Sequence, residues 1–255
     1  MSVPFSPEQV AEFRSRGFLI VRGLADPALR ADILTVARRH LEQHIAPIEY
    51  EADTNYPGAP RSRDAEGGRT ARRLLQVFER DEAFQRWALH RAVTERVRQL
   101  LDGGPIALTQ AHHNSLMSKQ PAFSSETRWH RDIRYWAFET PDLVSVWLAL
   151  GREYPENGSL GFLPGSNQLD LPAECFDERA FLRTDLPQNR ALIEQAHFTS
   201  LEPGDVVFFH AMTFHAAGWN RTDQTKHSLV YSYHRQDNLP LAGTRSASLP
   251  SVRID

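Results

Sequence analysis

The chain has 255 residues, 41% of them hydrophobic, and a formal net charge of -3. This length fits one β-rich domain, the charge gives no basic excess for nucleic acid, and the lone Cys175 excludes an internal disulfide or a multi-cysteine metal site. No apolar run approaches the roughly 18 residues of a membrane-spanning helix and the start lacks a signal-peptide pattern, so we expect a cytoplasmic protein with neither nucleic-acid nor membrane partners.

Helix signals dominate the N-terminal part of the chain. A serine cap followed by proline and glutamine in residues 6–9 predicts a helix that ends at Gly17. An apolar run over residues 18–22 predicts a short strand, and helical periodicity returns over residues 26–44. Residues 81–101 predict a further helix. Its expected buried stripe comprises Phe84, Trp87, Ala88, Val93 and Val97.

Residues 51–70 form the longest non-periodic segment and are rich in Gly, Pro, Asp and Arg. A long segment without secondary structure inside a compact domain is often a lid or a binding loop. We therefore expect this segment to cover a site.

The pattern changes from Ile106 onward to short apolar or alternating runs separated by Gly, Pro, Asn and Asp. These runs cover residues 106–117, 143–150, 159–163, 197–200, 206–210 and 228–234. Short strands at such spacing indicate an all-β sandwich or barrel.

The expected fold is therefore α+β: N-terminal helices packed on one sheet of a double-stranded β-helix, which is a jelly-roll or cupin-like barrel. We expect a single domain over residues 1–255. Residues 1–104 would provide the helical support and the lid, and residues 105–235 the barrel core. Residues 168–195 would be an insertion, with helices at 173–181 and 190–195.

One segment carries a candidate metal site. His130 and Asp132 are two residues apart, so on a strand their side chains would share a face. A histidine from a distant strand would complete a 2-His-1-carboxylate set, which is diagnostic of non-haem Fe(II) oxygenases. A His-x-Asp pair alone is weak evidence, because it is more often a plain hydrogen bond.

Two histidines compete for the third position. His210 and His215 are five residues apart, so on one regular strand they would face opposite ways. We favour His215, because the small residues 216–218 after it leave space for a metal, and we interpret His210 as a core histidine. The remaining strand histidines are interpreted as ordinary polar positions: His112, His113, His197, His227 and His234.

Three linked segments give these residues a family context. They cover residues 129–135, residues 156–167, and residues 203–210 leading into 215–220. In their order and spacing the chain resembles the phytanoyl-CoA dioxygenase family of Fe(II)/2-oxoglutarate-dependent oxygenases, over roughly residues 110–235.

The resemblance implies both ligands and cofactors. His130, Asp132 and His215 inherit the roles of metal ligands and catalytic residues, and Fe(II), the cosubstrate 2-oxoglutarate and O2 are the implied cofactors. The implied reaction hydroxylates an unactivated C–H bond and releases succinate and CO2. Halogenating relatives lack the carboxylate ligand, so the presence of Asp132 favours hydroxylation.

The cosubstrate anchor departs from the family pattern. The family usually has an arginine six residues after the asparagine that corresponds to Asn220, and this chain has Lys226 there. A lysine neutralises a carboxylate but lacks the bidentate fork of arginine. We expect Lys226 to be the anchor, helped by Ser228. The alternative is a solvated loop lysine, with Arg235 or Arg221 as less well placed anchors.

By resemblance, further residues contact the cosubstrate from neighbouring strands. These are Asn114, Ser118, Ser145 and Trp147. For Trp147 the competing interpretation is a core aromatic residue in an apolar strand.

The substrate is the least determined part. Basic residues gather at the expected lid, namely Arg61, Arg63, Arg69, Arg72 and Arg73. They either bind an anionic substrate group or form a solvated patch. We expect Arg73 to point inward and, with Tyr135, to contact a small polar metabolite. An acyl-CoA hydroxylase, a cupin-type enzyme that needs only metal and substrate, and a metal-binding barrel without 2-oxoglutarate turnover are the alternatives. The oligomeric state stays unknown.

Overall fold

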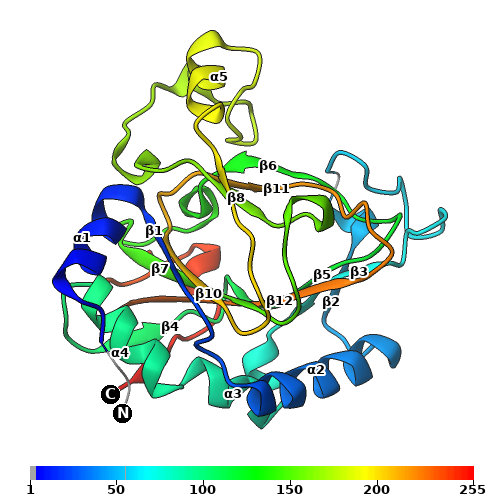
Figure 1. The fold of residues 1–255 in the computed structure, drawn as a ribbon, viewed down its shortest axis with the longest axis horizontal. Coiled ribbons are helices and arrows are strands. Elements are labelled where there is room, and N and C mark those ends of the chain that lie inside the picture. The colour runs from blue at the N-terminus through cyan, green and yellow to red at the C-terminus, as the bar shows by residue number, and fades with distance from the viewer. Residues whose placement is uncertain (1–3, 55) are drawn as a thin grey trace.

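The computed structural model describes residues 4–54 and 56–255 as two antiparallel sheets with helices outside them (Figure 1). The helices are α1 (Pro7–Arg16), α2 (Pro27–Glu42), α3 (Glu82–Ala88), α4 (Arg91–Leu100) and α5 (Pro187–Ile193). The strands are β1 (Phe18–Val21), β2 (Ile48–Tyr50), β3 (Ala71–Leu75), β4 (Ile106–Leu108), β5 (Asn114–Lys119), β6 (Thr127–His130), β7 (Leu143–Ala149), β8 (Leu160–Phe162), β9 (His197–Phe198), β10 (Val206–His210), β11 (His215–Ala217), β12 (Lys226–Arg235) and β13 (Val252–Ile254).

The start of α1 follows the sequence signals. The Ser6 hydroxyl accepts a hydrogen bond from the Gln9 backbone N–H, and the Gln9 side chain accepts one from the Ser6 backbone N–H. Gly17 ends the helix in the left-handed conformation, with φ of 82°. The capping box and the glycine stop are therefore both confirmed.

The expected single helix over residues 81–101 is instead two helices, α3 and α4. Leu89 ends α3, and the His90 side chain caps α4 by accepting a hydrogen bond from the Ala92 N–H at 3.3 Å. The predicted buried stripe is nevertheless correct, since all five of its residues are buried.

Within the described residues the larger sheet has nine strands in the order β1-β10-β7-β12-β5-β3-β2, with β4 pairing with β12 and β13 pairing with β4. Helices cover one face of it (Figure 1). On this face Tyr231 and Tyr233 of β12 donate to the backbone carbonyls of α3 residues Phe84 and Ala88. Because side chains alternate along a strand, the even-numbered residues of β12 face the opposite way, toward the smaller sheet.

The smaller sheet has four strands in the order β6-β11-β8-β9. Apolar residues of both sheets pack together between them, among them Trp147, Val230 and Phe209 from the larger sheet and Leu160 and Ala217 from the smaller. The interior thus has two layers: a helix-facing core outside the larger sheet and a second core between the sheets. Even-numbered β12 side chains enter the second one.

Several strands were not predicted or were predicted too long. The expected run over residues 106–117 is interrupted between β4 and β5, and β3 pairs with β5 although it was not predicted as a strand. After a 3-10 turn at Glu51–Asp53, the described residues up to β3 contain turns and bends, as expected for residues 51–70. The predicted domain and loop also include residues 1–3 and 55, which lie outside the described residues.

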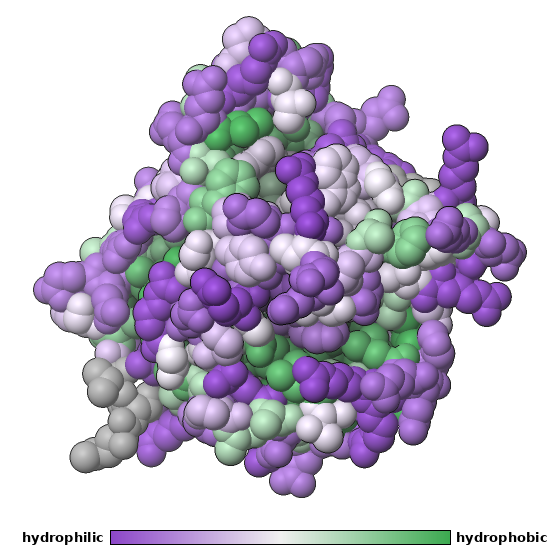
Figure 2. Space-filling model, turned by 45° about the vertical axis from the view of Figure 1, so that its right-hand side comes forward, coloured by the Kyte–Doolittle hydropathy of each residue, from purple (hydrophilic) through white to green (hydrophobic). Residues whose placement is uncertain are grey.

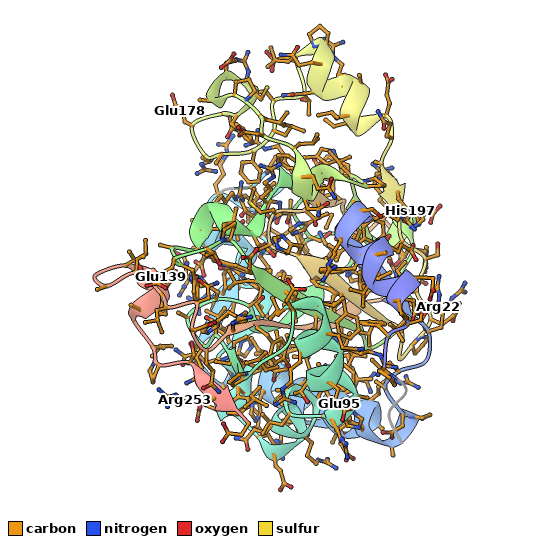
Figure 3. All side chains as sticks on the ribbon, turned by 90° about the vertical axis from the view of Figure 1, so that its left-hand side faces the viewer. Arg22, Glu95, Glu139, Glu178, His197 and Arg253 are labelled. Atoms are coloured by element: carbon orange, nitrogen blue, oxygen red, sulfur yellow. The ribbon has the colours of Figure 1, made fainter. Side chains whose placement is uncertain are left out.

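The expected insertion at residues 168–195 forms a lobe at one end of the molecule (Figure 1). Glu178, labelled in Figure 3, lies in this lobe. Its first predicted helix, 173–181, is only the 3-10 turn Ala173–Cys175, and its second lies earlier than predicted, as α5. Cys175 and Leu182 pack against Trp129 and Phe214 beneath the lobe. This contact joins the lobe to the smaller sheet.

Hydrophilic side chains cover most of the face shown in Figure 2, and apolar ones gather in smaller patches, one of them beneath the lobe. No helix in the described ranges 4–54 and 56–255 is both long and apolar enough to span a bilayer.

Candidate metal centre

Two histidines and an aspartate converge at one buried point. The Nε2 atoms of His130 and His215 lie 3.8 Å and 3.5 Å from Oδ1 of Asp132. One ligand atom from each of the three residues lies within 4.8 Å of the others. Two imidazoles and one carboxylate in this arrangement are the ligand set of the facial triad.

Backbone carbonyls fix the tautomer of both imidazoles. Nδ1 of His130 donates to the Arg128 carbonyl at 2.8 Å, and Nδ1 of His215 donates to the Thr213 carbonyl at 3.1 Å. A proton on Nδ1 leaves the Nε2 lone pair free for a metal. Burial first, and the neighbouring His215 and Arg134 second, lower the pKa of His130 well below its usual value. The imidazole of His130 is therefore neutral and competent as a ligand.

Strand pairing and a turn, rather than one strand, assemble the three ligands. His130 ends β6 and pairs directly with His215 at the start of β11. Asp132 is outside the strand and begins the 3-10 turn Asp132–Tyr135. The prediction that strand alternation places His130 and Asp132 on one face therefore rested on a wrong premise, because the turn redirects Asp132 toward the imidazoles.

The choice between His210 and His215 also rested on a wrong premise. The two lie on different strands and in different sheets: His210 ends β10 of the larger sheet and His215 begins β11 of the smaller. Nε2 of His210 lies 3.6 Å from Asp142, away from the cluster. The described residues therefore place His215, and not His210, with His130 and Asp132. His210 is half-buried rather than a full core residue.

The residues present fit a divalent cation. Asp132 is 1% exposed, and among the described residues its Oδ2 has only His113 Nδ1 and Ser145 Oγ as partners, each at 3.4 Å. Within the described ranges no Lys or Arg nitrogen lies within 4.0 Å of this carboxylate. A buried carboxylate without a cationic partner is costly. A metal ion between Asp132 and the two free Nε2 atoms would remove that cost.

The triad opens on a cavity of about 300 Å³ between the sheets and the loop at residues 51–70. Of the predicted contact residues, Ser118, Trp147, Lys226, Arg73 and Tyr135 line this cavity. The structure therefore brings these five to the triad. It does not bring Asn114, Ser145 or Ser228 to the cavity surface.

Lys226 is buried, not solvated, and it already has a carboxylate partner. Its Nζ lies 3.2 Å from Oε2 of Glu153 and 3.1 Å from the Ser228 hydroxyl. Glu153 also accepts from the Ser228 hydroxyl at 2.6 Å and from Trp147 Nε1 at 3.1 Å. Sequence reasoning missed Glu153, because nothing in the turn after β7 marks it as the partner of a lysine 73 residues away.

Lys119 is a second buried lysine at the same end of the cavity, and it was also missed. It pairs with Lys226 in the β5–β12 register, and its Nζ donates to the carbonyls of Ser125 and Gly218. Burial first, and the positive charges of Arg72 and Lys226 second, lower its pKa well below the usual value. In the sequence, the one sign of this role is that Lys119 follows the predicted strand run over residues 106–117.

Asn114 and Ser145 support the site from behind. Asn114 Oδ1 accepts from the Phe78 backbone N–H at 2.9 Å, so it holds the segment after β3. Ser145 contacts Asp132 at 3.4 Å and Ser232 at 2.7 Å. Neither side chain lines the cavity, and each forms its hydrogen bonds behind the cavity wall.

The arginines of the expected lid divide into two groups. Arg72 and Arg73 line the cavity, and each is held by a carboxylate, Glu51 for Arg72 and Glu49 for Arg73. Arg63 pairs with Asp53 and is more than half exposed. Arg73 therefore points inward as expected, while Arg61, Arg63 and Arg69 do not line the cavity.

Residues 13–228 match the family model described as phytanoyl-CoA dioxygenase (PhyH), the family that the linked motifs predict. A probable phytanoyl-CoA dioxygenase of Caenorhabditis elegans is 28% identical over 183 residues, which cover 67% of this chain and 56% of that protein. The ectoine dioxygenase of Halomonas elongata is 25% identical over 254 residues, which cover 92% and 71%. The chain thus spans little more than half the length of the nematode relative.

Solved structures share the fold. EctD from S. alaskensis in its apoform has a TM-score of 0.74 at 20% identity, over 96% of this chain and 82% of that one. The epimerase SnoN, solved with Fe3+, alpha ketoglutarate and nogalamycin RO, has a TM-score of 0.71 at 21% identity, over 96% and 93%. The arrangement of mixed helices and antiparallel sheets is therefore that of known 2-oxoglutarate-dependent enzymes.

Proposed function

Because this chain belongs to the phytanoyl-CoA dioxygenase family, we propose that it is an Fe(II)- and 2-oxoglutarate-dependent dioxygenase. In this proposal it hydroxylates an unactivated C–H bond of a small metabolite and releases succinate and CO2. Its two sheets form a double-stranded β-helix within one domain, residues 1–255. The observation that carries the proposal is the buried cluster of His130, Asp132 and His215, whose ligand atoms lie within 4.8 Å of one another beside a cavity.

The three ligands would hold iron, which when bound supplies the oxidising chemistry that O2 and 2-oxoglutarate drive. The chain's part is to prepare the ligands. The Arg128 and Thr213 carbonyls hold the Nδ1 proton of each imidazole, so that Nε2 of the neutral ring carries the lone pair that would bind the metal. The three ligands are buried, which limits their contact with bulk water.

The far carboxylate of the cosubstrate would be bound at the end of the cavity that holds Lys226, Trp147 and Ser118. Lys226 Nζ donates to Glu153 and to Ser228, and one of its three N–H bonds remains for a ligand. Lys119 adds a second buried N–H donor there. Arg73 and Tyr135, which also line the cavity, would contact the substrate.

One observation favours a second candidate function, a metal-binding barrel without 2-oxoglutarate turnover. Glu153 already neutralises Lys226, so the family's usual anchor position holds an ion pair instead of a free cation. Such a module would bind metal at the triad and leave 2-oxoglutarate unbound.

Anaerobic titration of the Fe(II)-loaded chain with 2-oxoglutarate separates the two. We expect a visible charge-transfer band to grow to saturation, followed by succinate release in air with an oxidisable substrate. Lys226→Ala should raise the 2-oxoglutarate concentration needed for half saturation at least tenfold, because the cavity loses a cation. Iron binding without the band and without succinate would establish the binding module. Turnover independent of 2-oxoglutarate would establish a cupin-type enzyme.

A further inference from the structure

A guanidinium from the C-terminal part of the chain lies at the cavity mouth. Arg245 lines the cavity although it is exposed, and it lies beyond residues 13–228, the part that matches the family model. We propose that Arg245 binds an anionic group of the substrate, a carboxylate or a phosphoryl group, and so makes the enzyme selective for small anionic metabolites. This inference rests on the function proposed above.

The segment that carries Arg245 is fastened to the cavity wall. The Ser246 hydroxyl, 2% exposed, accepts from the Ala137 N–H at 2.8 Å and lies 2.7 Å from Nε2 of His112. The Leu241 N–H donates to the Ala137 carbonyl at 2.9 Å. The 3-10 turn Arg245–Ala247 is therefore held beside the cavity at a defined place.

Contacts connect this turn to the metal site along one wall. His113 lies 3.4 Å from Asp132, and its ring meets that of Trp136 edge to face at 5.2 Å. Trp136 in turn stacks on His112 at 5.3 Å, and His112 contacts Ser246. A substrate held at Arg245 would thus lie along Trp136 toward the triad.

The charges around the cavity leave this cation without a partner. Glu51 pairs with Arg72, Glu49 with Arg73, and Glu153 with Lys226, all within 4.0 Å. Across residues 4–54 and 56–255, no carboxylate lies within 4.0 Å of the Arg245 guanidinium.

One further basic side chain of the cavity, Lys119, donates only to carbonyl oxygens among the residues that the structure describes, and it lies next to Lys226 at the cosubstrate end. The two basic side chains without a carboxylate partner therefore belong to different ligands. Lys119 stands where the cosubstrate would be bound, and Arg245 stands where the substrate would enter.

The neighbours of Arg245 add no competing charge. Burial first, and the positive charge of Arg245 second, lower the pKa of His112 to about 3, so this imidazole is neutral near pH 7. Arg245 therefore supplies the positive charge beside His112 and Trp136 on the cavity wall. A guanidinium presents two parallel N–H donors to a carboxylate or phosphoryl group, and the Trp136 ring offers an apolar surface beside it.

The test uses the full chain and a panel of matched probes. 4-Methylpentanoate and its neutral amide, 4-methylpentanamide, differ in the carboxylate, 2-aminoethylphosphonate carries a phosphoryl group, and butyryl-CoA represents thioesters. Binding of each is measured by calorimetry on the metal-free chain and on the Fe(II)·2-oxoglutarate complex, and succinate release is measured in air. Wild type, Arg245→Gln, Arg245→Lys and Arg253→Gln are compared. Arg253 is the matched control, because it is an exposed arginine of β13 away from the cavity (Figure 3).

We expect 4-methylpentanoate to bind wild type at least tenfold more tightly than 4-methylpentanamide. Arg245→Gln should remove that preference, Arg245→Lys should keep part of it, and Arg253→Gln should leave it intact. The carboxylate and phosphonate probes show which anion the site prefers. The inference is overturned if neutral and anionic probes bind wild type equally, if no anionic probe binds, or if Arg245→Gln changes the preference less than twofold. A wild-type chain that fails to bind 2-oxoglutarate instead contradicts the proposed function, and that binding is measured separately.

Discussion

Lys226 and Glu153 form an ion pair of 3.2 Å, with side chains only 2% and 0% exposed. Lys226, at the position where the family usually has an arginine, is therefore paired with a carboxylate from another part of the chain. Ser228 and Trp147 complete the hydrogen bonding of Glu153. Because both charges are buried, each depends on the other for its stability in the folded state.

The pair predicts a strong energetic coupling between its two members. Lys226→Met alone should lower the free energy of unfolding by about 3–5 kcal/mol, because it leaves the Glu153 carboxylate buried without its cation. Glu153→Gln alone should have a similar effect, because it leaves the Lys226 side chain buried without its carboxylate. The double variant removes both charges and should recover most of that loss. Chemical denaturation of the four proteins measures the coupling. Purely additive losses would contradict it.

Glu153 should also limit the affinity of the chain for 2-oxoglutarate. Its negative charge opposes a second carboxylate near Lys226, whereas glutamine keeps the shape and an acceptor for Ser228 and Trp147. Glu153→Gln should therefore lower the dissociation constant for 2-oxoglutarate about tenfold, which corresponds to about 1.4 kcal/mol. Anaerobic titration of the Fe(II)-loaded variant measures this. Unchanged or weaker affinity in a folded variant would show that Glu153 does not limit cosubstrate binding.

The sequence predicted the three residues of the buried cluster because three linked motifs, rather than a single pair, identify the family. It did not predict how the ligands meet. β6 and β11 are short, so the strand assumed at His130 was extended too far, through Asp132, and His215 was not separated from the strand that ends at His210. Glu153 was missed for a different reason: its meaning depends on a contact across the fold with Lys226.

The helical layer shows the same limit. The apolar stripe of residues 81–101 was right, because burial against the sheet sets it. The break at His90 was not, since it depends on an imidazole that caps α4 through one hydrogen bond. Periodicity reports which face is buried, whereas a histidine is an uncommon cap and gives no clear stop signal.

Iron binding should distinguish the two histidines that competed in the sequence. His215→Ala removes one of the three proposed ligands and should weaken Fe(II) binding by roughly a hundredfold or more. Loss of a residue that only hydrogen-bonds to a metal ligand typically costs about 10–100-fold in metal affinity, and loss of a ligand itself should cost at least as much. His210→Ala is the matched control, because His210 contacts Asp142 outside the cluster. Anaerobic metal titration measures both. Equal loss in the two variants would contradict the assigned ligand set.

His227 predicts a loss of stability in acid. Its Nδ1 is buried without a hydrogen-bond partner among the described residues, and burial, with Arg38 and Lys226 nearby, lowers its pKa to about 4. An unfolded histidine titrates near about 6.5, so unfolding takes up a proton once the pH falls below that value. The free energy of unfolding should therefore fall as the pH decreases from about 6.5 to about 4.

Glutamine at this position does not titrate, so His227→Gln should remove that part of the pH dependence. Between about pH 7.5 and pH 5, the variant should lose about 2 kcal/mol less stability than wild type, which follows from the difference between the two pKa values. Urea denaturation at both pH values gives the comparison. Because other buried histidines also resist protonation, such as His112 with a pKa of about 3, the variant should keep a shallower slope rather than none. Parallel slopes in the two proteins would mean that His227 accepts a proton in the folded chain as readily as in the unfolded one.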